Sequence, residues 1–232
     1  MIDTVDTTEL KEIQLFADLP EHDLQLLAGQ VRRSTVPAGT LLITAPVAGE
    51  AIYFIVEGSV KVQLVSENGV ELTIALLGPG QMVGEMSLVS GHGRAANVIT
   101  REETTLVWME RRAFLKAIDH SPSLTRNLLR ELSLRLEEAN GRLQALGTLD
   151  VTGRVARQVL ELAEQYGRPV PGQGTLIPLP VTQGEIAEMI AATRERVNQI
   201  MVRLKKASVL SVDPASRITV HRPDVLADLS RL

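Results

Sequence analysis

The chain has 232 residues, 44% of them hydrophobic and 22% charged, with a formal net charge of −4, which is typical of a globular protein. Its lack of cysteine excludes disulfides, thiolate nucleophiles and cysteine-bound zinc or iron–sulfur clusters. Neither an apolar run of about 20 residues nor a signal peptide is found, so we expect a cytoplasmic protein with no membrane partner.

Residues 9–30 carry helical spacing that Leu19-Pro20 interrupts, which predicts two short helices. From residue 35 to residue 110 the apolar period changes to two, as in strands with one buried face. Asn68-Gly69 lies between two such runs and is typical of a tight hairpin turn. Short strands broken by Gly and Pro predict an all-β barrel or a double-sheet roll. In the clearest runs, the alternation predicts these inward residues: Val60, Val62, Leu64, Leu72 and Ile74.

A helical period begins at Pro122 and continues to Gly147. A stripe this narrow, kept over nearly three heptads, favours a helix that pairs with a second copy of the chain. An amphipathic helix packed on its own domain is the alternative. Gly141 costs roughly 1 kcal/mol of helix propensity, which packing must offset. The stripe has steps of three and four residues and consists of Leu129, Leu132, Leu136, Ala139, Leu143 and Leu146.

The segment Gly147–Asp150 interrupts this helix where the charge of the chain changes. Residues 1–149 carry a net charge of −6, and residues 150–232 carry a net charge of +2. We predict a second domain here that opens with a helix over residues 151–166. The predicted parts are therefore a β-roll over 1–120, a long helix over 121–147 and a second domain over 150–232.

Two helices joined by a tight turn are predicted between residues 182 and 206. Thr182 and Glu185 have the spacing of a capping box, and Thr193 can cap the second helix. The stretch "VLSVDPASRITVHRP" follows as two short strands. This order is typical of a winged helix-turn-helix that binds DNA, although a helical hairpin with a solvated charged face is the alternative. The two predicted buried stripes are Ile186, Met189 and Ile190, and Val197, Ile200, Met201 and Leu204.

The outward residues of this motif suit both kinds of DNA contact. Residues 193–222 hold seven Lys and Arg against two Asp and Glu. Arg can make a bidentate hydrogen bond to guanine, Gln can pair with adenine, and Glu can accept a hydrogen bond from cytosine. Thr and Lys suit contacts to phosphates. The predicted DNA-binding residues are Thr182, Gln183, Thr193, Arg194, Glu195, Arg196, Gln199, Arg203, Lys205 and Lys206.

From about Leu10 to Arg222 the chain resembles the Crp/Fnr family of bacterial transcription regulators. The resemblance rests on "GSVKV", "GPGQMVGEMSLVSGHGRAANV", "LDVTGRVARQVLELA" and "QGEIAEMIAATRERVNQIMVRLKK". It implies an α+β fold with three parts. These are an N-terminal double-stranded β-helix, or jelly roll, that binds a cyclic nucleotide, a long dimerisation helix, and a C-terminal winged helix-turn-helix.

The stretch "GEMSL" followed by "RAA" is similar to the family's phosphate-binding cassette. The resemblance implies that Glu85 takes the ribose 2′-hydroxyl and that Arg94 pairs with the cyclic phosphate. This agrees with the needs of a ligand that has one free hydroxyl and one negative charge. No metal is expected. The ligand-binding residues implied are Val62, Ile74, Gly84, Glu85, Met86, Arg94, Ala95, Ala139 and Asn140.

Several positions depart from the family pattern. Ala95 stands where Ser or Thr is common, and Ala139 and Asn140 stand where hydroxyl side chains meet the base. Asn140 can still donate and accept hydrogen bonds. Gln199 replaces a common arginine. Ala191 replaces the turn glycine, which strains the backbone if φ is positive there.

We therefore expect a homodimeric transcription regulator, not an enzyme, that cAMP controls and that binds a palindromic site on double-stranded DNA. RNA polymerase is a further expected partner. A family member that needs no ligand, or that uses another small effector, stays open as an alternative. A hydrolase is not favoured, because the chain has no G-x-S-x-G elbow and no metal-spaced histidine pair. A nucleotide-binding module that regulates a partner protein would leave the basic second helix unexplained.

Overall fold

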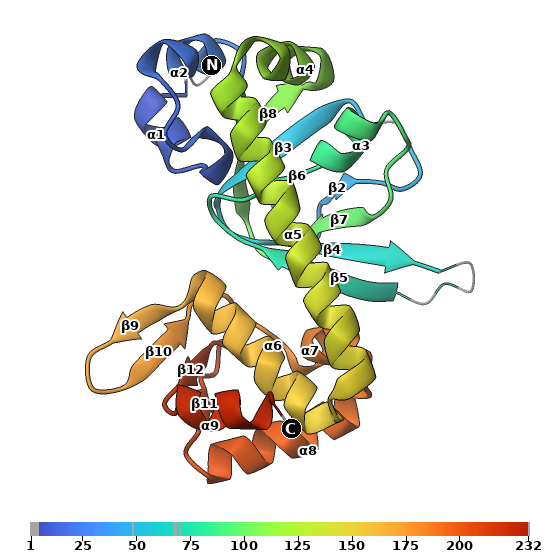
Figure 1. Ribbon diagram of the computed structural model, residues 1–232, viewed down its shortest axis with the longest axis vertical. Coiled ribbons are helices and arrows are strands. Elements are labelled where there is room, and N and C mark those ends of the chain that lie inside the picture. Colours follow the sequence, from blue (N-terminus) through green and yellow to red (C-terminus); the bar gives the residue numbers. More distant parts are fainter. Residues whose placement is uncertain (1–4, 48, 67–68, 70, 232) are drawn as a thin grey trace. The chain divides into compact units, whose positions relative to one another are not determined.

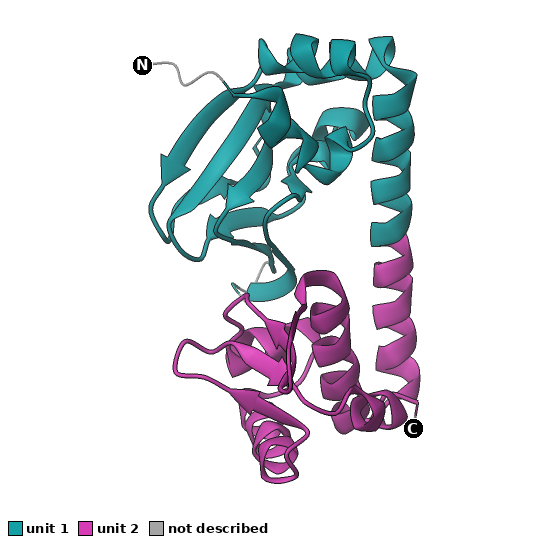
Figure 2. Cartoon of the chain, turned by 90° about the vertical axis from the view of Figure 1, so that its left-hand side faces the viewer, with its two compact units in different colours: residues 1–135 teal, residues 136–232 magenta. Residues whose placement is uncertain are grey.

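The structure, a computed structural model, describes residues 5–47, 49–66, 69 and 71–231 (Figure 1). It divides into two compact units, residues 1–135 and residues 136–232 (Figure 2). The division falls inside the long helix α5 (Pro122–Thr148), whose first half belongs to the first unit and whose second half belongs to the second.

Two four-stranded antiparallel sheets form the body of the first unit. The side chains between the sheets are aliphatic and come from both of them, so the sheets share one core. Apart from the consecutive β4 and β5, neighbouring strands are distant in sequence, as the predicted jelly roll requires. One sheet has the order β1 (Arg32–Val36), β8 (Thr104–Glu110), β3 (Ala51–Glu57) and β6 (Met82–Val83); the other has the order β2 (Leu41–Ile43), β7 (Asn97–Thr100), β4 (Val60–Val65) and β5 (Glu71–Leu77).

The β4–β5 pair confirms the predicted hairpin. Val65 lies opposite Glu71 at the end of the pair nearest the turn, and Gly69 has a φ of 76°. Positive φ is the conformation for which glycine is favoured at this turn. Asn68, the other residue of the predicted turn, lies outside the described residues.

The predicted inward faces of this hairpin are wrong beyond Val62. A register shift lies between Val62 and Gln63. Past this point Gln63 and Thr73 are buried, whereas Leu64 and Leu72 are exposed. The reason is physical: one irregular step in a strand moves every later side chain to the other face.

Helices cover the outer face of the sheet that contains β3 and β8. Phe16 meets Phe54 of β3 with ring centroids 4.7 Å apart. Asn127 of α5 donates to the main-chain oxygens of Leu15 and Ala17, at 3.1 and 2.7 Å, which fixes the start of α5 to this layer. The two predicted N-terminal helices are present with a 3₁₀ turn between them. The covering helices are α1 (Thr7–Lys11), η1 (Gln14–Phe16), α2 (Glu21–Ala28) and α4 (Arg111–His120).

Most of the apolar stripe along α5 is exposed to solvent in a single chain. Leu124 and Leu128 are buried in the core of the first unit and Leu132 packs against it, whereas the rest of the stripe is exposed. An exposed stripe with the spacing of a coiled coil is a surface that pairing would cover. Its exposed members are Leu129, Leu136, Ala139, Leu143 and Leu146, and Leu132 is half-buried.

The second unit contains the predicted helix-turn-helix and wing. The helix α6 (Val151–Tyr166) begins at the predicted residue, where the Asp150 carboxylate accepts from the Gly153 N–H at 2.8 Å. A four-stranded sheet follows the order β11-β12-β10-β9, with β11 and β12 as the wing. The other bounds are β9 (Arg168–Val170), β10 (Gly174–Ile177), α7 (Gln183–Met189), α8 (Arg194–Lys206), β11 (Leu210–Val212), β12 (Ile218–Val220) and α9 (Pro223–Leu229).

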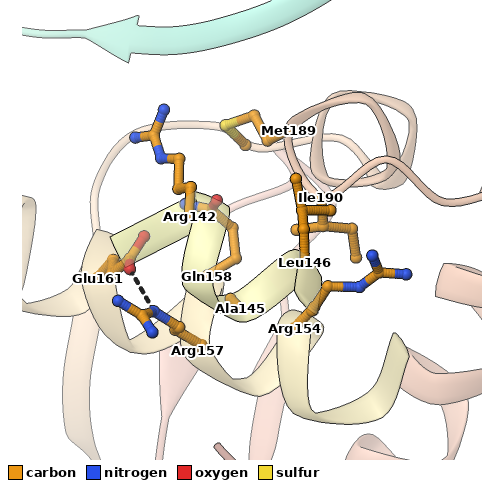
Figure 3. Close-up of a pocket in the computed structure, with 9 residues that line it drawn as sticks. All are labelled: Arg142, Ala145, Leu146, Arg154, Arg157, Gln158, Glu161, Met189 and Ile190. Carbon is orange, nitrogen blue, oxygen red and sulfur yellow. Dashed lines mark hydrogen bonds and ion pairs between the residues drawn. The ribbon is translucent and has the colours of Figure 1, made fainter. Parts of the chain in front are cut away.

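Within the second unit, the side chain of Arg157 from α6 reaches Gly141 of α5. A Cβ atom added there would overlap the guanidinium of Arg157 from α6. Arg157 also donates to Glu161 at 2.9 Å (Figure 3). The glycine therefore leaves room for this ion pair beside α5. This contact offsets part of the helix propensity that glycine loses relative to alanine.

Candidate functional site

Arg94 occupies a buried position between α3 (Glu85–Ser90) and β7, with 7% of its surface exposed. Its Nη1 donates to the Gly84 carbonyl at 2.6 Å, and its Nη2 donates to the Ala51 carbonyl at 2.5 Å. Burial lowers the pKa of the guanidinium, and the nearby Tyr53 and Glu85 act in the opposite direction. Because a guanidinium has five N–H donors, two carbonyl contacts leave donors for an anion.

Two glycines make room for this guanidinium. Gly84 has a φ of 97°, and a Cβ atom there would lie 2.5 Å from the Arg94 Nη1 atom. A Cβ atom on Gly49 would lie 2.8 Å from the Arg94 Cζ atom. Any larger residue at either position would displace the cation, so the glycines are part of the site.

Glu85, the first residue of α3, is also buried, with 2% of its surface exposed. Its Oε1 atom accepts from Arg135 at 2.6 Å. Its Oε2 atom is buried and has no hydrogen-bond partner among the residues that the structure describes. An unsatisfied buried acceptor costs about 1–3 kcal/mol, so this atom fits the hydroxyl donor of a ligand.

Arg135 is a site residue that the sequence reasoning missed. It projects from α5, pairs with Glu85, and donates from Nη2 to the Met82 carbonyl at 2.6 Å. It thereby connects the cassette to the long helix. The available signal was its position one helical turn before Ala139, which was already expected near the ligand.

The other residues expected at the ligand lie in three places. Val62 and Ile74 are half-buried on β4 and β5, and Ala95 is exposed next to Arg94. Met86 is exposed on α3. The structure thus brings together the cassette residues Gly84, Glu85 and Arg94. Ala139 and Asn140 lie on the part of α5 that belongs to the second unit, where both are exposed.

The helix-turn-helix has the caps predicted for it. The Thr182 hydroxyl accepts from the Glu185 N–H at 3.2 Å, and the Glu185 carboxylate accepts from the Thr182 N–H at 2.8 Å. Thr193 accepts from the Arg196 N–H at 3.3 Å and caps α8. In the turn between the helices Ala191 has a φ of 50°, so the strain expected from replacing glycine is present.

The polar face of α8 is exposed, and some of its side chains contact one another. Gln199 accepts from Arg196 at 3.4 Å and donates to Glu195 at 3.5 Å. The opposite face is buried and consists of the predicted Val197, Ile200, Met201 and Leu204. The residues expected to contact DNA are all exposed except for the half-buried Gln183: Thr182, Thr193, Arg194, Glu195, Arg196, Gln199, Arg203, Lys205 and Lys206.

Other kinds of site were also sought. Among the described residues, no group of three or more His, Asp and Glu side chains is placed to hold a metal ion. Within the same part of the chain, none of the helices has the length and apolar character that crossing a membrane requires.

Two family models match the chain: a cyclic nucleotide-binding domain over residues 33–121 and a Crp-like helix-turn-helix domain over residues 153–229. The CRP-like cAMP-activated global transcriptional regulator of Mycobacterium tuberculosis is 31% identical over 207 residues, covering 86% of this chain and 92% of that protein. The cyclic AMP receptor protein of Thermus thermophilus is 30% identical over 221 residues, covering 95% and 98%. The solved structure of the Thermus thermophilus catabolite activator protein matches with a TM-score of 0.53 at 29% identity, covering 94% of this chain and 98% of that one.

Proposed function

Because the chain belongs to the Crp/Fnr family of DNA-binding transcription regulators, we propose that it is a homodimer whose binding to a palindromic DNA site is controlled by cAMP. The family consists of transcription regulators and not of enzymes, and this chain has the cyclic nucleotide-binding domain. Contact with RNA polymerase and action in the cytoplasm belong to the same proposal.

The observation that carries the effector proposal is the unsatisfied Oε2 atom of Glu85 beside the buried Arg94. A cyclic nucleotide offers one hydroxyl donor on the ribose and one negative charge on the phosphate. Glu85 would accept from the 2′-hydroxyl, and the remaining N–H groups of Arg94 would donate to the phosphate. Both bonds form in a buried site, where they are stronger than in water.

Glu85 and Arg94 suit the ribose and phosphate of any cyclic nucleotide. The choice of cAMP takes its support from the relatives, two of which are named for cAMP. Val62 and Ile74 would pack near the base. Asn140 would bond to the adenine edge from the partner subunit, as the family resemblance implies. Ala139, which has no hydroxyl, would make only van der Waals contact with the base.

Two features support control through a dimer. The exposed stripe of α5 suits pairing with the same helix of a second copy. Arg135 connects that helix to Glu85, so a ligand that engages Glu85 also acts on α5. A dimer would place its two α8 helices to read half-sites about 34 Å apart, with Arg194, Glu195 and Gln199 at base edges.

Calorimetric titration with cAMP tests the effector. We expect Arg94→Leu to weaken binding by about 100-fold or more, because the phosphate loses a charge-assisted donor. The matched control Arg112→Leu, which removes an exposed arginine of α4, should bind as the parent does. A 2′-deoxy analogue should bind about tenfold more weakly, since Glu85 then keeps its unsatisfied atom. Equal binding by parent and Arg94→Leu would contradict the cassette assignment.

One observation favours a second candidate, a regulator that needs no ligand. Arg135 already supplies Glu85 with a cation, and Gly84 and Ala51 already supply Arg94 with acceptors. With these contacts made by the chain itself, the protein could adopt its DNA-binding conformation without a ligand. Electrophoretic mobility shifts without nucleotide distinguish the two: specific binding that cAMP, cGMP and cyclic di-GMP all leave unchanged would support this candidate over the first.

A further inference from the structure

A small pocket in the second unit lies among the end of α5, the helix α6 and the end of α7 (Figure 3). Its volume is about 20 Å³, which is room for about one particle of the size of a water molecule. Part of its wall is aliphatic and includes the buried Ala145 and Ile190. Because Ile190 is the C-cap residue of α7, directly before the turn residue Ala191, the pocket borders the helix-turn-helix.

The charged side chains of this pocket are mostly basic. Its arginines are Arg142 of α5 and Arg154 and Arg157 of α6. Among the described lining residues Glu161 is the single acid, and its carboxylate already accepts from Arg157 at 2.9 Å, as Figure 3 shows. Three positive charges against one negative charge give the lining a net charge of +2. Walls of one sign with apolar neighbours raise the local concentration of the opposite ion, which here is an anion.

The same pocket contains a buried hydrogen-bond donor that lacks an acceptor. The Nε atom of Arg154 is buried and has no hydrogen-bond partner among the residues that the structure describes. Gln158, which is 4% exposed, lies four positions further along α6 and therefore on the same face. Its side-chain amide adds two N–H donors. Leaving a buried donor unpaired is unfavourable, so these groups fit a ligand that accepts hydrogen bonds.

We propose that this pocket binds one chloride ion, with the Arg154 Nε–H and the Gln158 amide as donors and the three arginines as the compensating charge. Chloride only accepts hydrogen bonds, whereas a water molecule would bring two further donors into a pocket that is already rich in them. A phosphate or a nucleotide exceeds the volume of the pocket. The site consists of residues of the second unit alone, so it is independent of the proposed effector.

A bound chloride would stabilise the second unit in the arrangement that forms the pocket. It would contact α6 through Arg154 and Gln158 and lie against Ile190 at the end of α7, while the polar face of α8 stays available for DNA. We therefore expect the stability of the helix-turn-helix to depend on which anion is present and not only on the ionic strength.

Chloride NMR tests the site, because a chloride ion held by a protein gives a broader resonance than a free one. The parent should broaden the resonance in a saturable way. Arg154→Leu should weaken chloride binding by about tenfold or more, since a charge and a buried donor are both lost. Arg154→Lys keeps the charge but has no donor at the Nε position, so it should weaken binding as well. The matched control Arg168→Leu, which removes an exposed arginine of β9, should bind as the parent does.

Circular dichroism melts in sodium chloride and in sodium glutamate at equal ionic strength measure the effect on stability. The midpoint of the second-unit transition of the parent should be about 3 °C higher in chloride, whereas that of Arg154→Leu should not change. Equal broadening by the parent and by folded Arg154→Leu and Arg154→Lys overturns the inference, as does a chloride effect on the midpoint that Arg154→Leu retains.

The last test needs no variant. Crystals of the unmodified protein grown with sodium bromide should show an anomalous peak in contact with Arg154 and Gln158. A water molecule or a side chain at this point, with bromide found only elsewhere, overturns the chloride site. Neither result bears on cAMP binding at Glu85 and Arg94, which the calorimetric titration tests separately.

Discussion

The two functional regions of this chain are assembled over very different sequence distances. In the helix-turn-helix, Thr182 pairs with Glu185 and Thr193 with Arg196, three positions apart in each case. In the cassette, Arg94 reaches a partner 43 positions away, and Glu85 reaches one 50 positions away. The first kind of site is a property of a local segment, whereas the second exists only after the whole first unit has folded.

The largest effect expected from this difference is at Arg135. Replacing it by Leu leaves the buried Glu85 carboxylate without its 2.6 Å donor. Breaking a fully buried pair costs about 3–5 kcal/mol, and since Arg135 is partly exposed we expect about 2 kcal/mol. Urea unfolding followed by the fluorescence of Trp108, the single tryptophan and a residue of the first unit, measures it.

Two further variants make this result specific. Arg130→Leu removes an exposed arginine from the same helix and should change the stability by less than about 0.5 kcal/mol. Adding Glu85→Gln to Arg135→Leu should recover part of the loss, because the buried charge is then gone. If Arg135→Leu were as stable as Arg130→Leu, the long-range contact would not be what holds the cassette.

A smaller effect is expected from the local cap at Thr182. Thr182→Ala removes an N-cap and should cost about 1 kcal/mol. The transition of the second unit, followed by circular dichroism, should shift, while the Trp108 fluorescence transition of the first unit should not. Thr182→Ser keeps the hydroxyl and should behave as the parent does. A shift of both transitions together would show that the two regions do not unfold as separate units.

The smallest effect is a gain, at the turn of the helix-turn-helix. Ala191→Gly relieves a φ of 50°, which costs a non-glycine residue about 1 kcal/mol, although glycine loses more entropy on folding. We expect a net stabilisation of about 0.5 kcal/mol in the same circular dichroism transition. The exposed Ala207→Gly at the C-cap of α8, where φ is −82°, should not stabilise. Destabilisation by Ala191→Gly would mean that the strain is relieved elsewhere in the turn.

The sequence predicted the elements whose signals are local. The capping box, the cap at Thr193, the start of α6 after Asp150 and the wing around Asp213 all depend on neighbouring residues. The α5 stripe depends only on the helical period, whereas its exposure in one chain is a finding of the structure, because the same spacing also suits a helix packed on its own domain.

The remaining features could not be predicted in this way. The predicted inward faces of β4 and β5 were wrong beyond Val62, because the register shift between Val62 and Gln63 reverses the faces without changing the alternation of apolar and polar residues in the sequence. Arg135 was missed because an arginine on a helix surface is usually solvated, and only the fold brings this one to Glu85. Gly49 was missed for a related reason, since its role beside Arg94 depends on a contact 45 positions away in sequence.

Gly141 has a consequence for how this chain tolerates change. An alanine would make α5 a better helix by about 1 kcal/mol, yet its methyl group would take the place of the Arg157 guanidinium. A substitution that strengthens the helix would thus displace the Arg157 guanidinium, the end of a flexible side chain, and disturb its ion pair with Glu161. At this position, helix propensity and the placing of a side chain from another helix are opposing requirements, and the natural residue meets the second.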